Sequence, residues 1–168
     1  MTSPELNDRP SGSADFYASL PTKHVSAGCL LRDEQGHVLI VKPTYKAGWE
    51  IPGGSVEANE SPFDACRREV LEELGLRREP GRLLVVDYRR PVDGVRDDAL
   101  RIVFDGGVLN AADLASIALP PDELSEWRLV AADELGQYFP PALARRLRAC
   151  LTHPGAFLEE GIPAEPRF

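Results

Sequence analysis

The stretch GWEIPGGSVEANESPFDACRREVLEELGL, residues 48–76, decides the fold because a Gly-Gly turn is followed by a clearly bounded helix. The stretch also carries seven carboxylate side chains. Acidic residues on a helix usually form a solvated face, so a high count alone indicates no function. The positions of these carboxylates, rather than their number, indicate a binding site.

Signals at both ends predict a helix over residues 62–74. Ser61 suits the N-cap, Pro62 suits the first helical position, and Asp64 stands where the acid of a capping box is found. Gly75 fits the left-handed residue that commonly ends a helix. Between these ends, four apolar side chains share one arc of the helical wheel and are predicted to face the core: Phe63, Cys66, Val70 and Leu74.

Three acidic residues of this helix, Glu69, Glu72 and Glu73, have the i, i+3 and i+4 spacing that places them on one face. Like charges at this spacing destabilise a helix by roughly 0.2–0.5 kcal/mol per pair, a penalty that a bound cation would remove. Clustered carboxylate oxygens suit Mg²⁺ or Mn²⁺ rather than zinc, and Mg²⁺ often bridges to substrate phosphates. The helix therefore predicts a metal-dependent site for a phosphoryl or pyrophosphate substrate.

The whole chain sets bounds on the class of protein. Its 168 residues fit one domain, and its net charge of −8 disfavours a nucleic-acid polymer, because such partners are held by Lys and Arg. Three widely spaced cysteines indicate neither a disulfide framework nor a zinc site. No secretory signal precedes the domain, and no apolar run reaches the roughly 20 residues of a membrane span. We expect a cytoplasmic protein with no membrane partner.

Three segments are predicted along the chain. Residues 1–20, rich in Pro, Ser, Asp and Asn, are expected to be flexible, residues 21–153 to form the domain, and residues 154–168 to form a tail. One further helix is predicted at residues 141–151. Five β-rich runs lie at residues 24–31, 37–42, 82–88, 100–109 and 126–130. This pattern favours an α+β fold in which a mixed β-sheet lies between α-helices.

The segment from Gly54 to Leu76 resembles the signature of the Nudix hydrolase family, G-x5-E-x7-R-E-U-x-E-E-x-G-U, where U is an apolar residue. All nine specified positions are occupied, by Gly54, Glu60, Arg68, Glu69, Val70, Glu72, Glu73, Gly75 and Leu76. The resemblance implies a Nudix fold. It also implies hydrolysis, with Mg²⁺ or Mn²⁺, of a pyrophosphate bond in a nucleoside diphosphate linked to another moiety.

The resemblance also assigns expected roles to single residues. It implies metal ligation by the carbonyl oxygen of Gly53 and by the carboxylates of Glu69, Glu72 and Glu73. Arg68, with Glu60, is expected to support catalysis by orienting the loop and the helix. The general base stays open between Glu73 and Glu126, which precedes Trp127 and is also a candidate metal ligand. Glu123 is interpreted as a surface residue.

Substrate contacts lie outside the motif, where the sequence is less informative. Lys42, Arg89 and Arg90 are candidate substrate-binding residues because they can meet phosphate. Pro91 stands 15 residues after Leu76, an offset at which some Nudix enzymes acting on ADP-ribose carry a proline. The segment from Tyr138 to Leu151 instead resembles the end of Nudix proteins that cleave nucleoside triphosphates. Both substrate classes therefore stay open.

Other functions remain possible for this fold. Some Nudix-fold proteins sense a nucleotide without cleaving it, but their motif is usually degraded, whereas this motif is intact. A metal-binding structural domain would not need the Gly-Gly turn, Glu60 and Arg68 together. A metal-dependent hydrolase acting on a small nucleotide is therefore the favoured function, and a regulatory binding module is the alternative. Homodimers are common in the family, so the resemblance leaves a homodimer open as the assembly.

Overall fold

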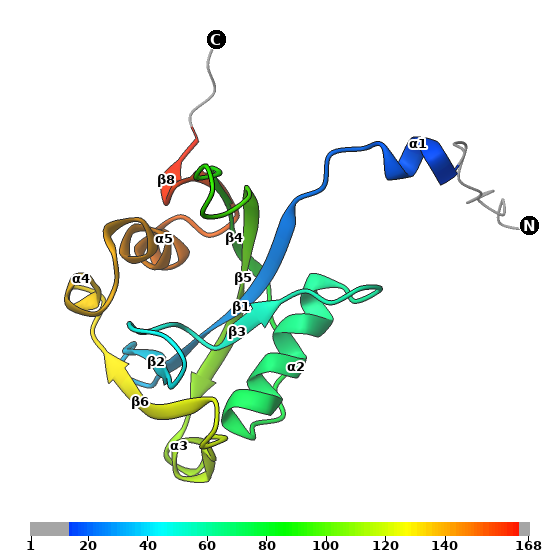
Figure 1. The fold of residues 1–168 in the computed structure, drawn as a ribbon. Helices are drawn as coiled ribbons and strands as arrows, with labels where there is room; N and C mark the ends of the chain where they lie inside the picture. Colours follow the sequence, from blue (N-terminus) through cyan, green and yellow to red (C-terminus); the bar gives the residue numbers. More distant parts are fainter. Residues whose placement is uncertain (1–13, 165–168) are drawn as a thin grey trace, which may run out of the picture.

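The computed structural model describes residues 14–164, which form one β-sheet with helices on both of its faces (Figure 1). Residues 1–13 and 165–168 of the predicted terminal segments lie outside the described part. No helix in the described part is long and apolar enough to cross a bilayer. The elements in chain order are α1 (Ala14–Ala18), β1 (His24–Asp33), β2 (Val38–Pro43), β3 (Gly53–Ser55), α2 (Pro62–Leu74), β4 (Leu83–Arg89), β5 (Ala99–Leu109), α3 (Ala111–Ser116), β6 (Leu124–Val130), α4 (Leu135–Tyr138), α5 (Pro141–Thr152), β7 (Ala156–Glu159) and β8 (Ile162–Pro163).

The sheet is mixed, with strand order β6-β2-β1-β5-β4-β7-β8. β1 runs parallel to β5, and β4 runs parallel to β7, whereas the other pairs are antiparallel. β3 pairs with residues 26–28 of β1, on the edge that β2 occupies further along the strand. The predicted α+β class, with a mixed sheet between helices, is confirmed.

Two apolar clusters hold the sheet between α2 and α5, which lie on opposite sides of it (Figure 1). The cluster under α5 includes the fully buried side chains of Leu30, Val85, Leu147 and Leu158. The cluster under α2 includes those of Leu31, Leu39, Val70 and Leu74. Burying one such side chain contributes about 1.5–3 kcal/mol, so the two clusters together fix both helices against the sheet.

The ends of α2 form as the sequence predicts. The Ser61 hydroxyl accepts a hydrogen bond from the Asp64 amide at 3.1 Å, and Gly75 has a left-handed φ of 71°. The core-facing arc differs at its first residue, because Phe63 is 38% exposed while Ala65 is buried. The Phe63 ring packs edge-to-face on Phe104 of β5, with centroids 5.6 Å apart, which covers only part of it.

Six short elements of the structure were not predicted from the sequence. β3, α1, α3, α4, β7 and β8 were not predicted, and each has six residues or fewer. After α5 the chain does not leave the domain, because β7 pairs with β4 and β8 pairs with β7. Gly and Pro residues interrupt this part of the sequence, which hides the strand pattern.

A buried ion pair joins these last strands to the domain. Arg146 of α5 donates from Nε to Asp87 of β4 at 2.6 Å, and the Gly161 amide donates to the other Asp87 oxygen at 2.9 Å. Asp87 is completely buried. Removing one partner of a buried pair leaves an uncompensated charge, so α5, β4 and the β7–β8 turn depend on one another.

We predict that Gly106→Ala destabilises the domain by about 1–3 kcal/mol, the usual cost of overpacking a core. An added Cβ would lie 2.6 Å from both Cys29 Sγ and Leu31 Cδ2. Gly136→Ala on α4 is the matched control, because its nearest neighbour would be Arg148 Nη2 at 3.4 Å. The measurement is the free energy of unfolding in urea. Equal values for the two variants would show that the sheet tolerates the extra atom.

Candidate active site

The Arg68 side chain connects α2 to the loop that follows β3. It donates to both carboxylate oxygens of Glu60, at 2.8 and 3.0 Å, and to the Ser55 carbonyl at 3.2 Å. It also donates to Glu69 at 2.7 Å and to Glu72 at 2.9 Å. The hydrogen bonds from Arg68 lower the pKa of Glu60 to about 2. One guanidinium thus fixes the loop relative to the acidic face of α2.

The two glycines of β3 allow a close approach that a side chain would prevent. Gly53 has φ 148°, and a Cβ there would lie 2.3 Å from the Ala27 carbonyl oxygen. A Cβ on Gly54 would lie 2.2 Å from Glu69 Oε1. Glu73 Oε2 accepts a hydrogen bond from the Gly53 amide at 2.9 Å. β3 therefore lies directly against the carboxylates of α2, as only glycine permits.

Glu73 is the most perturbed carboxyl group of the motif. Burial raises its pKa to about 8, while the hydrogen bond from the Gly53 amide acts in the opposite direction. The nearby carboxylates of Glu69, Glu50 and Glu123 raise it further. Burial also raises the pKa of Glu69, against the lowering effect of Arg68. The turn and α2 thus hold partly buried carboxyl groups whose charged forms a nearby cation would stabilise.

These residues suit a divalent cation by their chemistry but not by their present arrangement. Within residues 14–164, no group of three His, Cys, Asp or Glu side chains is arranged to hold a metal ion. Arg68 binds Glu69 and Glu72, the Gly53 amide binds Glu73, and the Glu72 side chain is 54% exposed. Carboxylate oxygens remain the donors that Mg²⁺ and Mn²⁺ prefer. Metal binding would require rotation of Glu69 and Glu72 away from Arg68.

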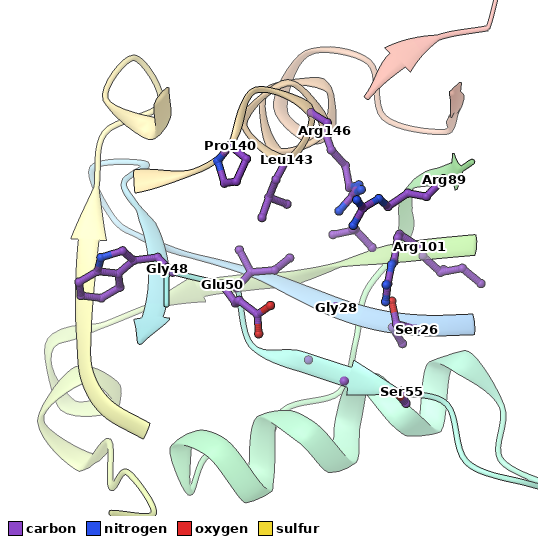
Figure 2. Close-up of a pocket in the computed structure, with 18 of the residues that line it drawn as sticks. Ser26, Gly28, Gly48, Glu50, Ser55, Arg89, Arg101, Pro140, Leu143 and Arg146 are labelled. Atoms are coloured by element: carbon purple, nitrogen blue, oxygen red, sulfur yellow. The ribbon is translucent and has the colours of Figure 1, made fainter. Parts of the chain in front are cut away.

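A cleft of about 590 Å³ opens between the sheet and α5 and reaches the β3 turn (Figure 2). This volume lies within the range of about 300–1,000 Å³ that is usual for small-molecule sites. Ser26 and Gly28 of β1 line the cleft, where their small size leaves room. Other lining residues are Trp49, Glu50, Ser55, Arg89, Arg101 and Arg146.

The structure brings only one of the three predicted substrate-binding residues into this cleft. Arg89 lines it, whereas Lys42 and Arg90 do not. The Lys42 ammonium lies over the Trp49 ring, 5.8 Å from its centroid. Arg90 is exposed and pairs with Glu159 at 3.2 Å. Arg89 is therefore the member of the set that can meet a ligand there.

Glu126 lies apart from the acidic face of α2. It accepts a hydrogen bond from Arg128 at 2.6 Å and stands opposite Lys42 in the ladder between β6 and β2. Its neighbour Trp127 packs against the apolar cluster under α2. Because successive side chains of a strand point to opposite faces, Glu126 points to the other face of the sheet. Glu123, interpreted from the sequence as a surface residue, is exposed but close enough to act on Glu73.

Three charged residues of the cleft were missed in the sequence: Glu50, Arg101 and Arg146. Arg101 is two residues before the buried Val103 on β5 and so shares its face of the sheet, which could have indicated that Arg101 points inward. Arg146 stands between Ala144 and Leu147 on the buried side of α5. A charged residue at such a position is a signal for a site or a buried pair.

Comparison with known proteins places the motif in a family. The NUDIX domain family model matches residues 22–152. The chain belongs to the Nudix hydrolase family. A "MutT-like protein" from Streptomyces ambofaciens is 34% identical over 110 residues, which are 64% of this chain and 71% of the relative. An "RNA pyrophosphohydrolase" from Halorhodospira halophila (strain DSM 244 / SL1) is 39% identical over 51 residues, 30% of this chain and 28% of the relative.

A solved Nudix-type fold agrees with the arrangement described above. The crystal structure of the MutT protein from Methanosarcina mazei Go1 superposes with a TM-score of 0.66 at 25% sequence identity. The match covers 80% of this chain and 97% of that protein. The likeness therefore extends over the sheet and its helices, beyond the Nudix motif.

We predict that Gly54→Ala lowers hydrolytic activity at least about tenfold with little loss of stability. The added Cβ would displace the flexible end of Glu69 rather than backbone. A misplaced catalytic group commonly costs up to about a hundredfold in rate. Gly136→Ala, outside the cleft, is the control. Activity assays and thermal unfolding of both variants test the prediction, and unchanged activity in Gly54→Ala would show that the Glu69 position is unimportant.

Proposed function

We propose that this Nudix protein hydrolyses a pyrophosphate bond in a nucleoside diphosphate linked to another moiety, using Mg²⁺ or Mn²⁺. The observation that carries the proposal is the contact between the β3 glycines and the carboxylates of α2, at the edge of a ligand-sized cleft. The relative named RNA pyrophosphohydrolase supports the reaction type. Nucleoside triphosphates and nucleotide sugars such as ADP-ribose are the proposed substrate classes.

The proposed metal ligands are Glu69, Glu72 and Glu73, with the Gly53 carbonyl oxygen as a further ligand. A bound divalent cation would neutralise phosphate charge and lower the pKa of a water molecule. Arg68 acts as a positioning residue, because its hydrogen bonds to Glu60 and Ser55 hold the loop while the helix carboxylates bind. The motif therefore contains glutamates that are proposed to bind metal and an arginine that holds the loop in position.

Glu73 is the proposed general base, and Glu126 is the competing candidate. Glu73 is partly buried beside the turn, and the carboxylates of Glu69, Glu50 and Glu123 act on it electrostatically. Glu126 is already bound to Arg128 on the other face of the sheet. Accepting a proton from a water molecule requires hydrogen-bond reach of the reacting centre, which favours Glu73.

We expect metal-dependent cleavage of at least one compound in a panel of ADP-ribose, other nucleoside diphosphate sugars, dinucleoside polyphosphates, and normal and oxidised dNTPs. Glu73→Gln should lower turnover at least about a hundredfold, the lower range for loss of a general base. Chromatographic product analysis identifies the bond that is cut, and circular dichroism checks the fold of the variant. Binding without cleavage by the wild-type protein would instead support a sensing module.

Glu126→Gln is expected to lower turnover less than about tenfold, because the Glu126 carboxylate is bound to Arg128 away from the acidic face of α2. Loss of a surface ion pair commonly costs no more than about 1 kcal/mol. Steady-state kinetics of this variant and of Glu73→Gln, on the same substrate, separate the two candidate bases. A hundredfold loss in Glu126→Gln would make Glu126 the base or a metal ligand.

A further inference from the structure

Three arginines from different elements converge on one part of the cleft: Arg89 of β4, Arg101 of β5 and Arg146 of α5 (Figure 2). In the β4–β5 ladder, Arg101 stands opposite Asp87 and Arg89 stands opposite Ala99. Residues two apart on a strand share a face, so Arg89 and Arg101 both point to the α5 side. The third arginine, Arg146, comes from α5, which packs on this face of the sheet. Sheet register and helix packing together create this group, which we call the arginine group.

The arginine group is only partly neutralised by the protein. Arg146 pairs with the buried Asp87 at 2.6 Å. The guanidinium groups of Arg89 and Arg101 form no hydrogen bond or ion pair within residues 14–164, and Arg89 Nε is buried without a partner. Burial lowers the pKa of both arginines, and repulsion from the neighbouring arginines lowers each pKa further. Because buried donors are nearly always paired, we expect a bound ligand to supply the missing hydrogen-bond acceptor.

The acidic residues that act on Arg89 do not supply that acceptor, because Asp87 is bound to Arg146 and Glu160 accepts a hydrogen bond from the Arg90 amide. Glu50 is the only acidic residue among the described residues that line the cleft, and Lys46 pairs with it at 2.8 Å. Glu50 also acts electrostatically on both Glu73 and Arg101, so it lies between the acidic site at α2 and the arginine group. The cleft therefore has a basic region that is separate from the α2 carboxylates.

We propose that Arg89, Arg101 and Arg146 form a subsite for a second phosphoryl group, one that the substrate carries in addition to the pyrophosphate that is cleaved. The planar guanidinium presents donors in a fork that matches phosphate oxygens, and it is weakly hydrated. The inference rests on the proposed function, and it narrows the substrate to a compound that carries a further phosphate outside the pyrophosphate.

The first experiment measures phosphate binding without catalysis. Inorganic pyrophosphate is titrated calorimetrically into the full-length protein in EDTA, which removes the contribution of metal. Arg101→Gln and Arg89→Gln should each weaken binding at least about tenfold, as expected for a hydrogen bond to a charged group. Arg82→Gln, exposed just before β4, removes the same charge outside the cleft and should bind like wild type. Arg146→Gln is avoided because Arg146 also holds Asp87.

No binding to the wild-type protein, or equal affinity in wild type, Arg101→Gln and Arg89→Gln, would overturn the proposal. Weaker binding in all three variants, Arg82→Gln included, would also overturn it, because net charge alone would then explain the effect. Thermal unfolding of each variant checks that the loss of pyrophosphate binding does not come from a loss of overall stability.

The second experiment uses substrate pairs that differ by one phosphate: coenzyme A and its dephospho form, NADP⁺ and NAD⁺, and 2′-phospho-ADP-ribose and ADP-ribose. The phosphorylated member of a cleaved pair should have a kcat/KM at least about tenfold higher, and Arg101→Gln should bring the ratio close to one. Equal values within every cleaved pair would refute the subsite while hydrolysis stands. Absence of any cleavage would count against the proposed function, and the pyrophosphate titration would then decide the subsite.

Discussion

The close approach of β3 to α2 is the constraint on which the candidate site depends. Gly53 lies against the β1 backbone, so a side chain there would push β3 away from β1, and a side chain at Gly54 would displace the Glu69 carboxylate. Arg68 stabilises the same contact by donating hydrogen bonds to the Ser55 carbonyl and to the Glu60 carboxylate. The acidic face of α2 is thus held by backbone packing and one guanidinium rather than by the carboxylates themselves, which repel one another.

The two faces of the sheet carry different parts of the site. On the α2 face, β1 contributes Ala27, Cys29 and Leu31 to the core beneath the acidic helix. On the α5 face, the same strand presents Ser26 and Gly28 to the cleft before Leu30 returns to the core. The alternation of side chains along one strand therefore supports the acidic site on one side and leaves space for a ligand on the other.

The sequence was sufficient to predict α2 and the family, but not the cleft. The capping residues Ser61 and Gly75 act locally, so their effect can be predicted from neighbours in the chain. The position of Arg146 depends on how α5 packs across Asp87, a contact between residues 59 apart in sequence. β7 was not predicted for a similar reason, because its four residues become a strand through pairing with β4 and β8. Local signals cannot specify contacts of this kind.

The negative net charge of the chain and the arginine group act on anions over different distances. A net charge of −8 repels extended polyanions, whose binding needs many cations along a surface. Three arginines enclosed in a cleft act instead over a few ångströms, where a low local dielectric strengthens their attraction for a compact anion. Cleft walls formed by α5 and the β3 turn also limit the size of what can reach them. The negative net charge therefore disfavours an extended polyanion but does not argue against a small phosphorylated ligand in this cleft.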